Sequence, residues 1–133
     1  SDYPQLVTLY KHSDQFKFDE VTDSESGITK KVEKDPESLL VAEESAHLVG
    51  SVSIIEDGRI ALLFRLVAEP KYPENEHVLK LLIEKAESIL KGRGYQEVHN
   101  TAPMNDINAL MERQKLGFKE GDIYTWFWKK LNP

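Results

Sequence analysis

The sequence predicts an α/β domain in which a mixed central sheet is flanked by helices. Two observations predict this fold class. Three short apolar segments separated by turn residues follow one another between residues 38 and 68, and a strongly amphipathic helical pattern then runs from Val78 to Leu90. A further strand, a short helix and an aromatic segment come after that helix, so the sheet must contain a crossover connection.

Size and charge describe an ordinary globular chain. The 133 residues suit one domain, and we expect a single domain over residues 1–133. Hydrophobic residues make up 40% and charged residues 30%, which is enough apolar material for a core. The formal net charge is −6, and basic residues cluster only in short pairs such as Lys30-Lys31 and Lys129-Lys130. A phosphate-binding face needs more positive charge, so we expect no nucleic-acid partner.

The chain contains no cysteine, which excludes disulfides, thiolate catalysis and cysteine-based zinc sites. The longest apolar stretch, Ile60 to Ala68, is interrupted by Arg65 and is too short to span a bilayer. The polar N-terminus has no apolar segment of the kind found in secretory signals. We therefore expect a cytoplasmic location without a membrane partner.

The first half of the chain predicts a helix, a loop and a strand series. Asp2 as N-cap and Pro4 in the first turn predict a helix to about Gln15. The polar segment 16–36 reads as a loop that contains a short amphipathic helix around Ile28 to Glu33. Strands are expected at Ser38–Glu43, His47–Ile55 and Arg59–Ala68, with a hairpin turn at Glu56-Asp57-Gly58 and a stop at Pro70.

The second half predicts a long helix, a strand, a short helix and a last strand. The long helix ends at Gly92 and Gly94, which are typical C-terminal caps. A strand is expected at Gln96–Thr101, followed by a helix from Asn105 or Asp106 to about Lys115. Ile123–Lys130 is predicted to form an aromatic-rich final strand.

Several of these segments resemble the GNAT family of N-acetyltransferases. Leu48-Val49-Gly50 matches the start of the family's third strand, and Asn105 to Ala109 followed by Leu116-Gly117-Phe118 matches its late helix. The resemblance covers essentially the whole chain and implies a GNAT-like mixed sheet, acetyl-CoA as cofactor and an amine as acceptor. The family's first strand would precede Ser1, so we expect this strand to be missing or truncated.

The turn after the third predicted strand departs from the family pattern. The family places Arg or Gln and then two glycines here, so that pyrophosphate approaches backbone N–H groups at a helix N-terminus. In this chain Pro73 replaces the Arg or Gln, Glu76 the first glycine and Val78 the second. At an effective dielectric of 20 and a distance of about 6 Å, each carboxylate of Glu74 or Glu76 would repel a phosphate by about 3 kcal/mol.

Two interpretations of this turn stay open. In one, the helix N-terminus is satisfied by its own side chains and no longer binds a ligand. In the other, it still binds acetyl-CoA, and the resemblance then implies the following cofactor contacts: Ala68, Pro70, Asn75, Glu76, His77, Val78, Asn105, Asn108 and Arg113.

The catalytic residues that the resemblance implies are also replaced. The family's acid, a tyrosine of the late helix, falls on Arg113, which cannot donate a proton near neutral pH and lies either against the ligand or on a solvated helix face. Tyr124, on the predicted last strand, is the preferred substitute, and Tyr72 and Tyr95 are further candidates. Glu69, just after the third strand, is the candidate base. The four histidines show no ligand spacing, so no metal site is expected.

Two functions follow from these observations. The first is transfer of an acetyl group from acetyl-CoA to a small-molecule or peptide amine, by a non-standard site. The second is a degenerate GNAT domain that acts as a binding, regulatory or interaction module, with a homodimer or a partner domain as its partner. A cleft between splayed fourth and fifth strands of the family fold favours the enzyme, whereas a cleft filled by Tyr72, Glu74 or Glu76 favours the module.

Overall fold

The computed structural model describes residues 2–132, and Ser1 and Pro133 lie outside the described residues. The chain divides into two compact units, one up to Thr101 and one from Ala102 onward. The first unit holds the sheet, three α-helices and a short 3-10 helix, and the second holds one α-helix and an extended C-terminal segment. Whether the two units act as one domain stays a prediction.

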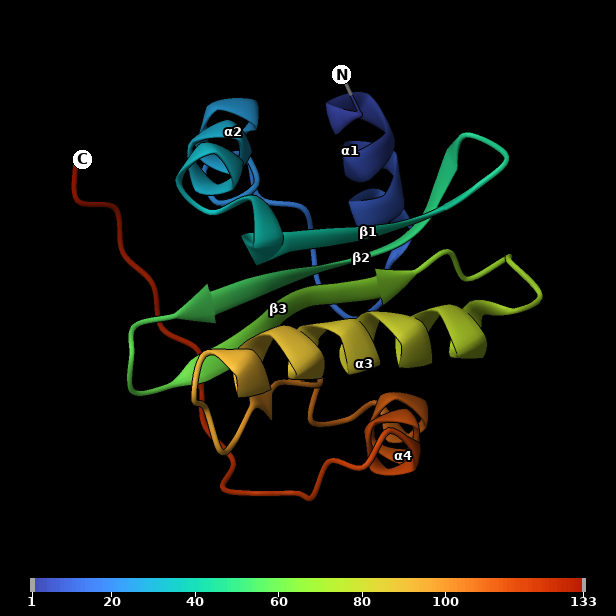
Figure 1. The fold of residues 1–133 in the computed structure, drawn as a ribbon, viewed down its shortest axis with the longest axis vertical. Helices are drawn as coiled ribbons and strands as arrows, with labels where there is room; N and C mark the ends of the chain where they lie inside the picture. Colours follow the sequence, from blue (N-terminus) through green and yellow to red (C-terminus); the bar gives the residue numbers. More distant parts are fainter. Residues whose placement is uncertain (1, 133) are drawn as a thin grey trace. The chain divides into compact units, whose positions relative to one another are not determined.

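The first unit contains a four-stranded mixed sheet with the strand order β1-β2-β3-β4. Strands β1 (Leu39–Glu44), β2 (His47–Glu56) and β3 (Ala61–Ala68) form an antiparallel meander. Strand β4 (His99–Asn100) pairs parallel to β3 after the crossover through the long helix (Figure 1). The predicted α/β class with a mixed sheet flanked by helices is confirmed.

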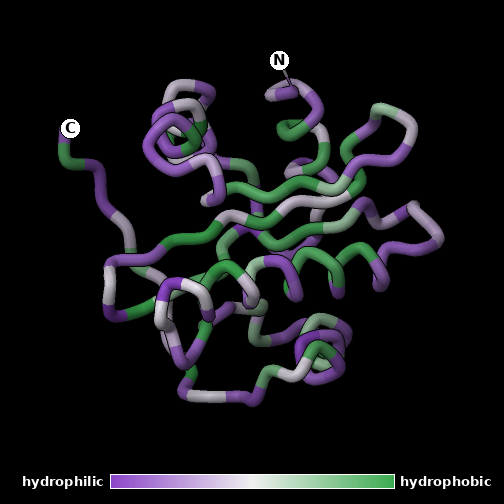
Figure 2. The backbone as a smooth tube through the Cα atoms, viewed as in Figure 1, coloured by the Kyte–Doolittle hydropathy of each residue, from purple (hydrophilic) through white to green (hydrophobic). Residues whose placement is uncertain are grey.

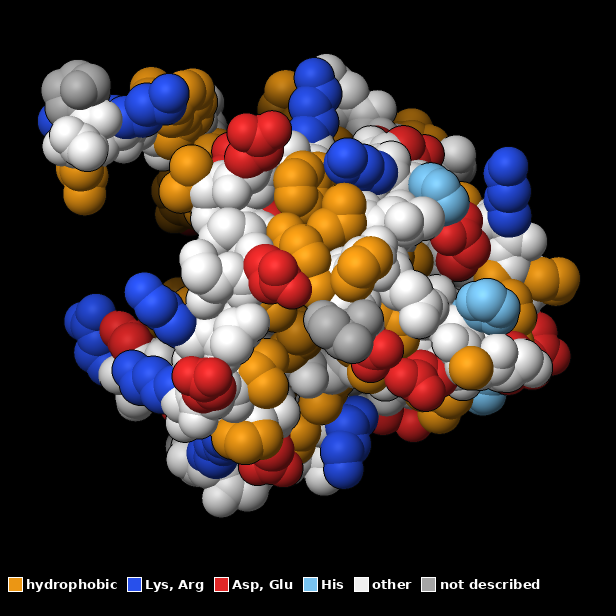
Figure 3. Space-filling view, turned by 90° about the horizontal axis from the view of Figure 1, so that it is seen from above, with side chains coloured by type: hydrophobic (Ala, Val, Ile, Leu, Met, Phe, Trp, Pro, Cys, Tyr) orange, Lys and Arg blue, Asp and Glu red, His pale blue; other side chains and the backbone are white. Residues whose placement is uncertain are grey.

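Helices cover both faces of this sheet. Helices α1 (Tyr3–His12) and α2 (Glu25–Lys34) lie on one face, and α3 (Asn75–Gly92) lies on the other (Figure 1). A short 3-10 helix, η1 (Pro36–Ser38), leads into β1. Hydrophobic residues follow the strands and the inner side of α3 (Figure 2). The side that carries α1 and α2 shows acidic, basic and hydrophobic side chains interspersed (Figure 3).

Two helix boundaries differ from the prediction. Helix α1 ends at His12 and not near Gln15, because Ser13 is extended, and Asp2 makes no side-chain capping bond. Helix α2 extends beyond the predicted helix Ile28–Glu33 at both ends, and its start is capped by the Ser24 hydroxyl, which accepts the Gly27 N–H at 3.1 Å. Among the described helices, none is long and apolar enough to cross a membrane.

The strands after α3 are shorter than predicted. The segment Gln96–Thr101 forms only the two residues of β4, and the predicted final strand Ile123–Lys130 does not form. Aromatic residues favour strands only where a neighbouring strand and a half-buried surface receive them, and residues 118–131 have no strand partner in the described structure. In the second unit, helix α4 (Ile107–Lys115) begins at Asp106, whose carboxylate accepts the Ala109 N–H at 3.0 Å, so this helix is confirmed.

Two irregularities bend the meander near one end of the sheet. The register of β2 shifts against β1 between Gly50 and Leu48, and β3 carries one extra residue opposite Ser51–Ser53. Arg65 lies in this bulge with a φ of 55°, a left-handed conformation that is costly for a residue other than glycine. Its guanidinium bonds both carboxylate oxygens of Asp23 at 3.1 and 3.0 Å and lies over the rings of Phe16 and Phe64.

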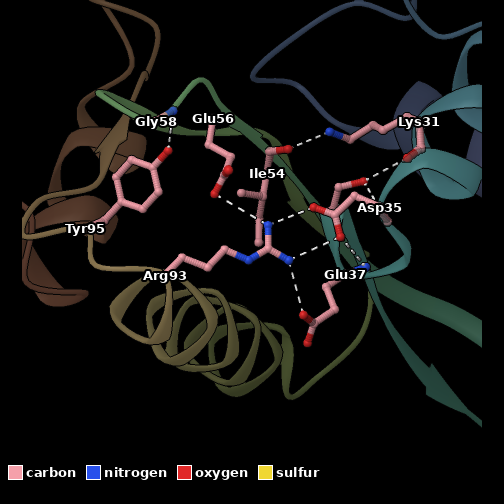
Figure 4. A network of polar contacts seen from close by, with 9 residues as sticks. Lys31, Asp35, Glu37, Ile54, Glu56, Gly58, Arg93 and Tyr95 are labelled. Carbon is pink, nitrogen blue, oxygen red and sulfur yellow. Dashed lines mark hydrogen bonds and ion pairs between the residues drawn. The ribbon is translucent and has the colours of Figure 1, made fainter.

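The opposite end of the sheet is held by Arg93, which follows α3 directly. Its guanidinium donates to Asp35 at 2.7 Å, to Glu37 at 3.1 Å and to Glu56 at 3.4 Å (Figure 4). These contacts join the C-terminal end of α3 to η1 and to the end of β2. The Asp35 carboxylate has its pKa lowered, first by the hydrogen bond from Arg93 and also by the Glu37 N–H.

Candidate active site

Strands β3 and β4 separate after a very short pairing. They pair only at Leu62↔His99 and Leu63↔Asn100, while β3 continues to Ala68. The Asn100 side chain donates to the Leu63 carbonyl at 2.8 Å, where the pairing ends. Beyond this point, the described residues provide no strand partner for the edge of β3 that faces β4. The edge of β3 beyond Leu63 is therefore unpaired within the first unit.

The backbone of Ala68 faces this open edge. In an antiparallel pair, alternate residues direct their N–H and C=O groups toward the same neighbour. The Glu69 N–H bonds to the Val49 carbonyl on β2 at 2.8 Å, so the N–H of Ala68 is directed away from β2. An unpaired strand edge of this kind binds extended amide chains through backbone hydrogen bonds.

The N-terminus of α3 lies directly after this strand. Glu74 stands at the N-cap position and makes no side-chain capping bond, so the interpretation that the helix end is satisfied by its own side chains finds no support at this residue. The Asn75 side chain donates to the Pro70 carbonyl at 3.2 Å and fixes the turn. The turn therefore has a defined shape, and the positive end of the helix dipole is not neutralised by Glu74 through a cap.

One predicted cofactor residue, Val78, is engaged within the fold. Val78 is buried, and its N–H donates to the Glu74 carbonyl at 3.0 Å. Its side chain lies against β2, because a Cβ atom added to Gly50 would come within 2.5 Å of Val78 Cγ1. The branched side chain thus packs into the sheet and does not obstruct the helix end. Glu76 and His77 are exposed in the first turn of α3.

Glu69 is paired with a histidine that the sequence analysis did not select. Glu69 Oε2 lies 2.7 Å from Nδ1 of His12, the last residue of α1. The Glu69 side chain is 23% exposed and that of His12 is 48% exposed, so both reach solvent. The residues are 57 positions apart, and no spacing rule connects them. Only the packing of α1 against the end of β3 brings them together.

A cavity of about 410 Å³ lies beside Glu69. It is formed by one side of α1, the start of β2 and the residue that follows β3. Its lining residues are Pro4, Gln5, Thr8, Leu9, His47, Leu48, Val49 and Glu69. All of them belong to the first unit, and Glu69 supplies the one carboxylate in this lining.

The tyrosine candidates lie in different settings. Burial of its ring, followed by the charges of Glu44 and Glu74, raises the pKa of Tyr72 above its ordinary value, so its hydroxyl stays protonated near neutral pH. The Tyr95 hydroxyl accepts the Gly58 N–H at 2.7 Å near Arg93 (Figure 4), which is a structural role. Tyr124 is 84% exposed and does not lie on a strand, in contrast to the prediction.

The remaining predicted residues belong to the second unit. Asn105 and Asn108 are exposed at the start of α4. Arg113 is 8% exposed and donates to Glu112 at 2.8 Å, so its assignment to a solvated helix face is wrong. Burial lowers the pKa of Arg113. The contribution of these three residues to a ligand site stays a prediction. Among residues 2–132 the structure shows no cluster of potential metal ligands.

The chain is similar to bacterial acetyltransferases. It is 28% identical over 131 residues to an acetyltransferase of Sodalis glossinidius, covering 98% of this chain and 89% of that protein. It is 27% identical over 124 residues to an acetyltransferase of Pectobacterium atrosepticum, covering 93% and 86%. No family model matches the chain.

Solved structures share the fold. The PaiA N-acetyltransferase of Thermoplasma acidophilum, in complex with coenzyme A, superposes with a TM-score of 0.77 at 20% identity, covering 92% of this chain and 87% of that one. A GNAT-family acetyltransferase of Streptococcus pneumoniae gives 0.67 at 24% identity, with 90% and 81% covered. The protein AAC(6')-Iy, in complex with the bisubstrate analog CoA-S-monomethyl-acetylneamine, gives 0.72 at 17% identity, with 97% and 92% covered.

Solved acetyltransferases share this fold, in which β3 and β4 pair only briefly and a long helix follows β3. Together with the sequence relatives, it supports a GNAT-family N-acetyltransferase, and the resemblance predicted from the sequence is confirmed.

Proposed function

We propose that this protein transfers an acetyl group from acetyl-CoA to the nitrogen of a primary amine. The observation that carries the proposal is the short pairing of β3 with β4, which leaves an unpaired strand edge next to the N-terminus of α3. Support comes from the similar fold of PaiA, which was solved with coenzyme A, and of AAC(6')-Iy, which was solved with the bisubstrate analog CoA-S-monomethyl-acetylneamine.

The residues present fit a coenzyme A molecule at this edge. The Ala68 N–H, directed away from β2, can bond an amide of the pantetheine arm, and the first turn of α3 offers backbone N–H groups and a positive dipole to the pyrophosphate. The carboxylates of Glu74 and Glu76 weaken this interaction and do not remove it, because both side chains are exposed and screened by salt. When bound, acetyl-CoA supplies a thioester whose acyl carbon accepts the amine.

The chain supplies the proton acceptor and the proton donor. Glu69, with His12 at 2.7 Å, takes the proton that an ammonium must lose before its nitrogen can react. Tyr72, which belongs to the same unit as Glu69, donates a proton to the sulfur of the leaving group.

Calorimetry with acetyl-CoA at low salt, paired with thermal unfolding, tests the proposal. We expect a one-to-one complex of micromolar affinity and about 2.7 kcal/mol of added stability at a hundredfold excess over the dissociation constant. Release of a free thiol on addition of amines then shows turnover. Absence of both heat and a thermal shift up to millimolar acetyl-CoA sinks the transferase proposal for this chain.

A binding or regulatory module is the second candidate. It is favoured by the replacement of the family's turn residues, with Pro73 in place of Arg or Gln and Glu76 in place of the first glycine. This candidate predicts that no amine releases thiol from acetyl-CoA, whether or not acetyl-CoA binds. Thiol release that depends on an amine excludes it.

A further inference from the structure

We propose that the cavity beside Glu69 is the acceptor site, and that its ligand is a compact amine with one positive charge and an apolar body. This inference rests on the transferase function proposed above. It assigns the cavity, the charge and shape of the acceptor, and a role for His12. Each assignment follows from the residues that line or adjoin the cavity.

Buried apolar residues form part of the cavity wall. Leu9, Leu48 and Val49 are buried residues of α1 and β2 and contribute to the lining. Two of the polar side chains in the lining already make hydrogen bonds within the protein. The Gln5 side-chain carbonyl accepts the Leu48 N–H at 2.9 Å, and the Thr8 hydroxyl donates to the Pro4 carbonyl at 3.1 Å. These walls favour an apolar ligand body over a polyhydroxylated one.

Charge selects the end of the ligand that reacts. Glu69 is the carboxylate of the lining, and no lysine or arginine lines the cavity. The carboxylate of Glu69 attracts a cationic group of the ligand and repels a carboxylate or phosphate. A volume of about 410 Å³ falls at the small end of the range for small-molecule pockets, about 300 to 1,000 Å³, so the expected ligand is a small amine and not a folded protein surface.

His12 connects this carboxylate to solvent. The ammonium of the acceptor bonds to Glu69, which lies 2.7 Å from His12 Nδ1, and His12 is half-exposed. One proton of the ammonium passes through this pair to solvent. The amine nitrogen then forms its bond to the acyl carbon as the carbon–sulfur bond breaks. The electron pair of that bond stays on sulfur, which takes up a second proton from the nitrogen by way of a donor group.

Acceptor preference is tested with three amines and the full chain. 2-Phenylethylamine represents the compact apolar monocation, spermidine a polycation, and phenylalanine the same apolar body with an added carboxylate. We expect kcat/KM to be at least tenfold higher for 2-phenylethylamine than for either of the others. Equal or higher kcat/KM for phenylalanine or spermidine overturns the assigned acceptor class.

Two variants test the site itself. Thr8→Trp fills the cavity from the exposed side of α1, and we expect it to raise the KM for the amine at least tenfold while the dissociation constant of acetyl-CoA stays unchanged. Lys11→Trp, also exposed on α1 but outside the lining, is the matched control and should keep the wild-type KM. An unchanged KM in Thr8→Trp removes the cavity as the acceptor site.

His12→Gln tests the proton path. Glutamine can still bond to Glu69 but cannot carry a proton, so kcat should fall by about 10²-fold or more while KM and acetyl-CoA affinity stay near wild type. A wild-type kcat overturns the role of His12. If amines are acetylated in all variants at wild-type rates, the transferase function holds and this inference fails. If wild-type protein binds no acetyl-CoA, both fail.

Discussion

At the scale of single residues, the pair of Asp23 and Arg65 is the most deeply buried ion pair among the described residues. Its side chains are 2% and 11% exposed. We predict that Asp23→Asn lowers the free energy of unfolding by about 3–5 kcal/mol, because it leaves the Arg65 charge buried without a counter-charge. Urea unfolding of both proteins measures the difference. Asp57→Asn, which breaks an exposed ion pair with Arg59, should cost much less. Equal losses of unfolding free energy in the two variants would show that burial does not increase the contribution of the ion pair to stability.

A second prediction concerns acid stability. The pKa of Asp35 is lowered in the folded state from the ordinary value of 3.8, so its ion pair stabilises the fold above that value and this contribution is lost as the pH falls through the lower, folded-state pKa. We expect Asp35→Asn to be less stable than wild type at pH 7, with a smaller loss of stability from pH 5 to pH 2. Denaturant midpoints across this range measure both effects. Arg93→Gln should flatten the profile in the same way, because Arg93 supplies the largest part of the shift. A profile as steep as wild type in both variants contradicts this account.

Sequence reasoning reaches single residues only where a motif or a fixed spacing marks them. Glu69 is a candidate base because it lies just past the end of the strand on which the family often carries its base, and that strand has no carboxylate of its own. His12 was not selected, because its contact with Glu69 depends on how α1 packs on the sheet. Val78 stands where the family has a glycine, but its side chain packs toward Gly50, a direction that the sequence alone does not give.

At the scale of elements, the close packing of α3 on β2 depends on Gly50. A Cβ atom there would lie 2.5 Å from Val78 Cγ1 and 3.2 Å from the Val67 carbonyl. We predict that Gly50→Ala costs about 1–3 kcal/mol of stability and weakens acetyl-CoA binding, because the first turn of α3 must move. Thermal unfolding and calorimetry measure the two effects. Gly92→Ala, where a Cβ atom meets nothing within 4 Å, is the control and should be neutral or slightly stabilising. A Gly50→Ala protein with wild-type stability would show that α3 adjusts at no cost.

The helix N-terminus gives a prediction in which stability and binding change in opposite directions. Glu74→Gln removes a negative charge that stabilises the start of α3, so the melting temperature should fall slightly. The same change removes repulsion of the pyrophosphate, so acetyl-CoA should bind several-fold more tightly at low salt, with a smaller gain at high salt. Calorimetry at two salt concentrations checks both parts. Weaker binding of acetyl-CoA to the variant would place the pyrophosphate away from this helix end.

Helices and strands with a clear hydrophobic periodicity were predicted correctly, and the one predicted strand that does not form lacks it. The meander and the long helix show clear periodicity, and the structure contains them with boundaries shifted by a few residues. The prediction of a last strand was wrong. Ile123–Lys130 has the composition of a strand, but the described structure offers it no neighbouring strand to pair with. Strand β4 is likewise limited to the two residues that find a partner on β3.

At the scale of the whole molecule, the C-terminal segment exposes an unusual amount of apolar surface. Ile123, Tyr124, Trp126, Phe127 and Trp128 are all largely exposed. Contiguous apolar surface of this kind marks interaction sites in soluble proteins. We predict that the protein forms a homodimer at micromolar concentration and that the double variant Trp126→Ser, Phe127→Ser is monomeric. Sedimentation equilibrium across a concentration series decides the matter. A wild-type protein that stays monomeric at all concentrations rules out self-association through this segment.

Trp126 and Trp128 are the only tryptophans of the chain, and both lie in this exposed segment. Intrinsic tryptophan emission therefore comes entirely from a part of the molecule outside the sheet. A denaturation curve followed by this emission would report on the C-terminal segment, and the loss of the sheet could pass without a signal. Far-ultraviolet circular dichroism follows the sheet and its helices instead. The same property makes the emission a selective probe, because any partner that covers the segment would shift it without labelling of the protein.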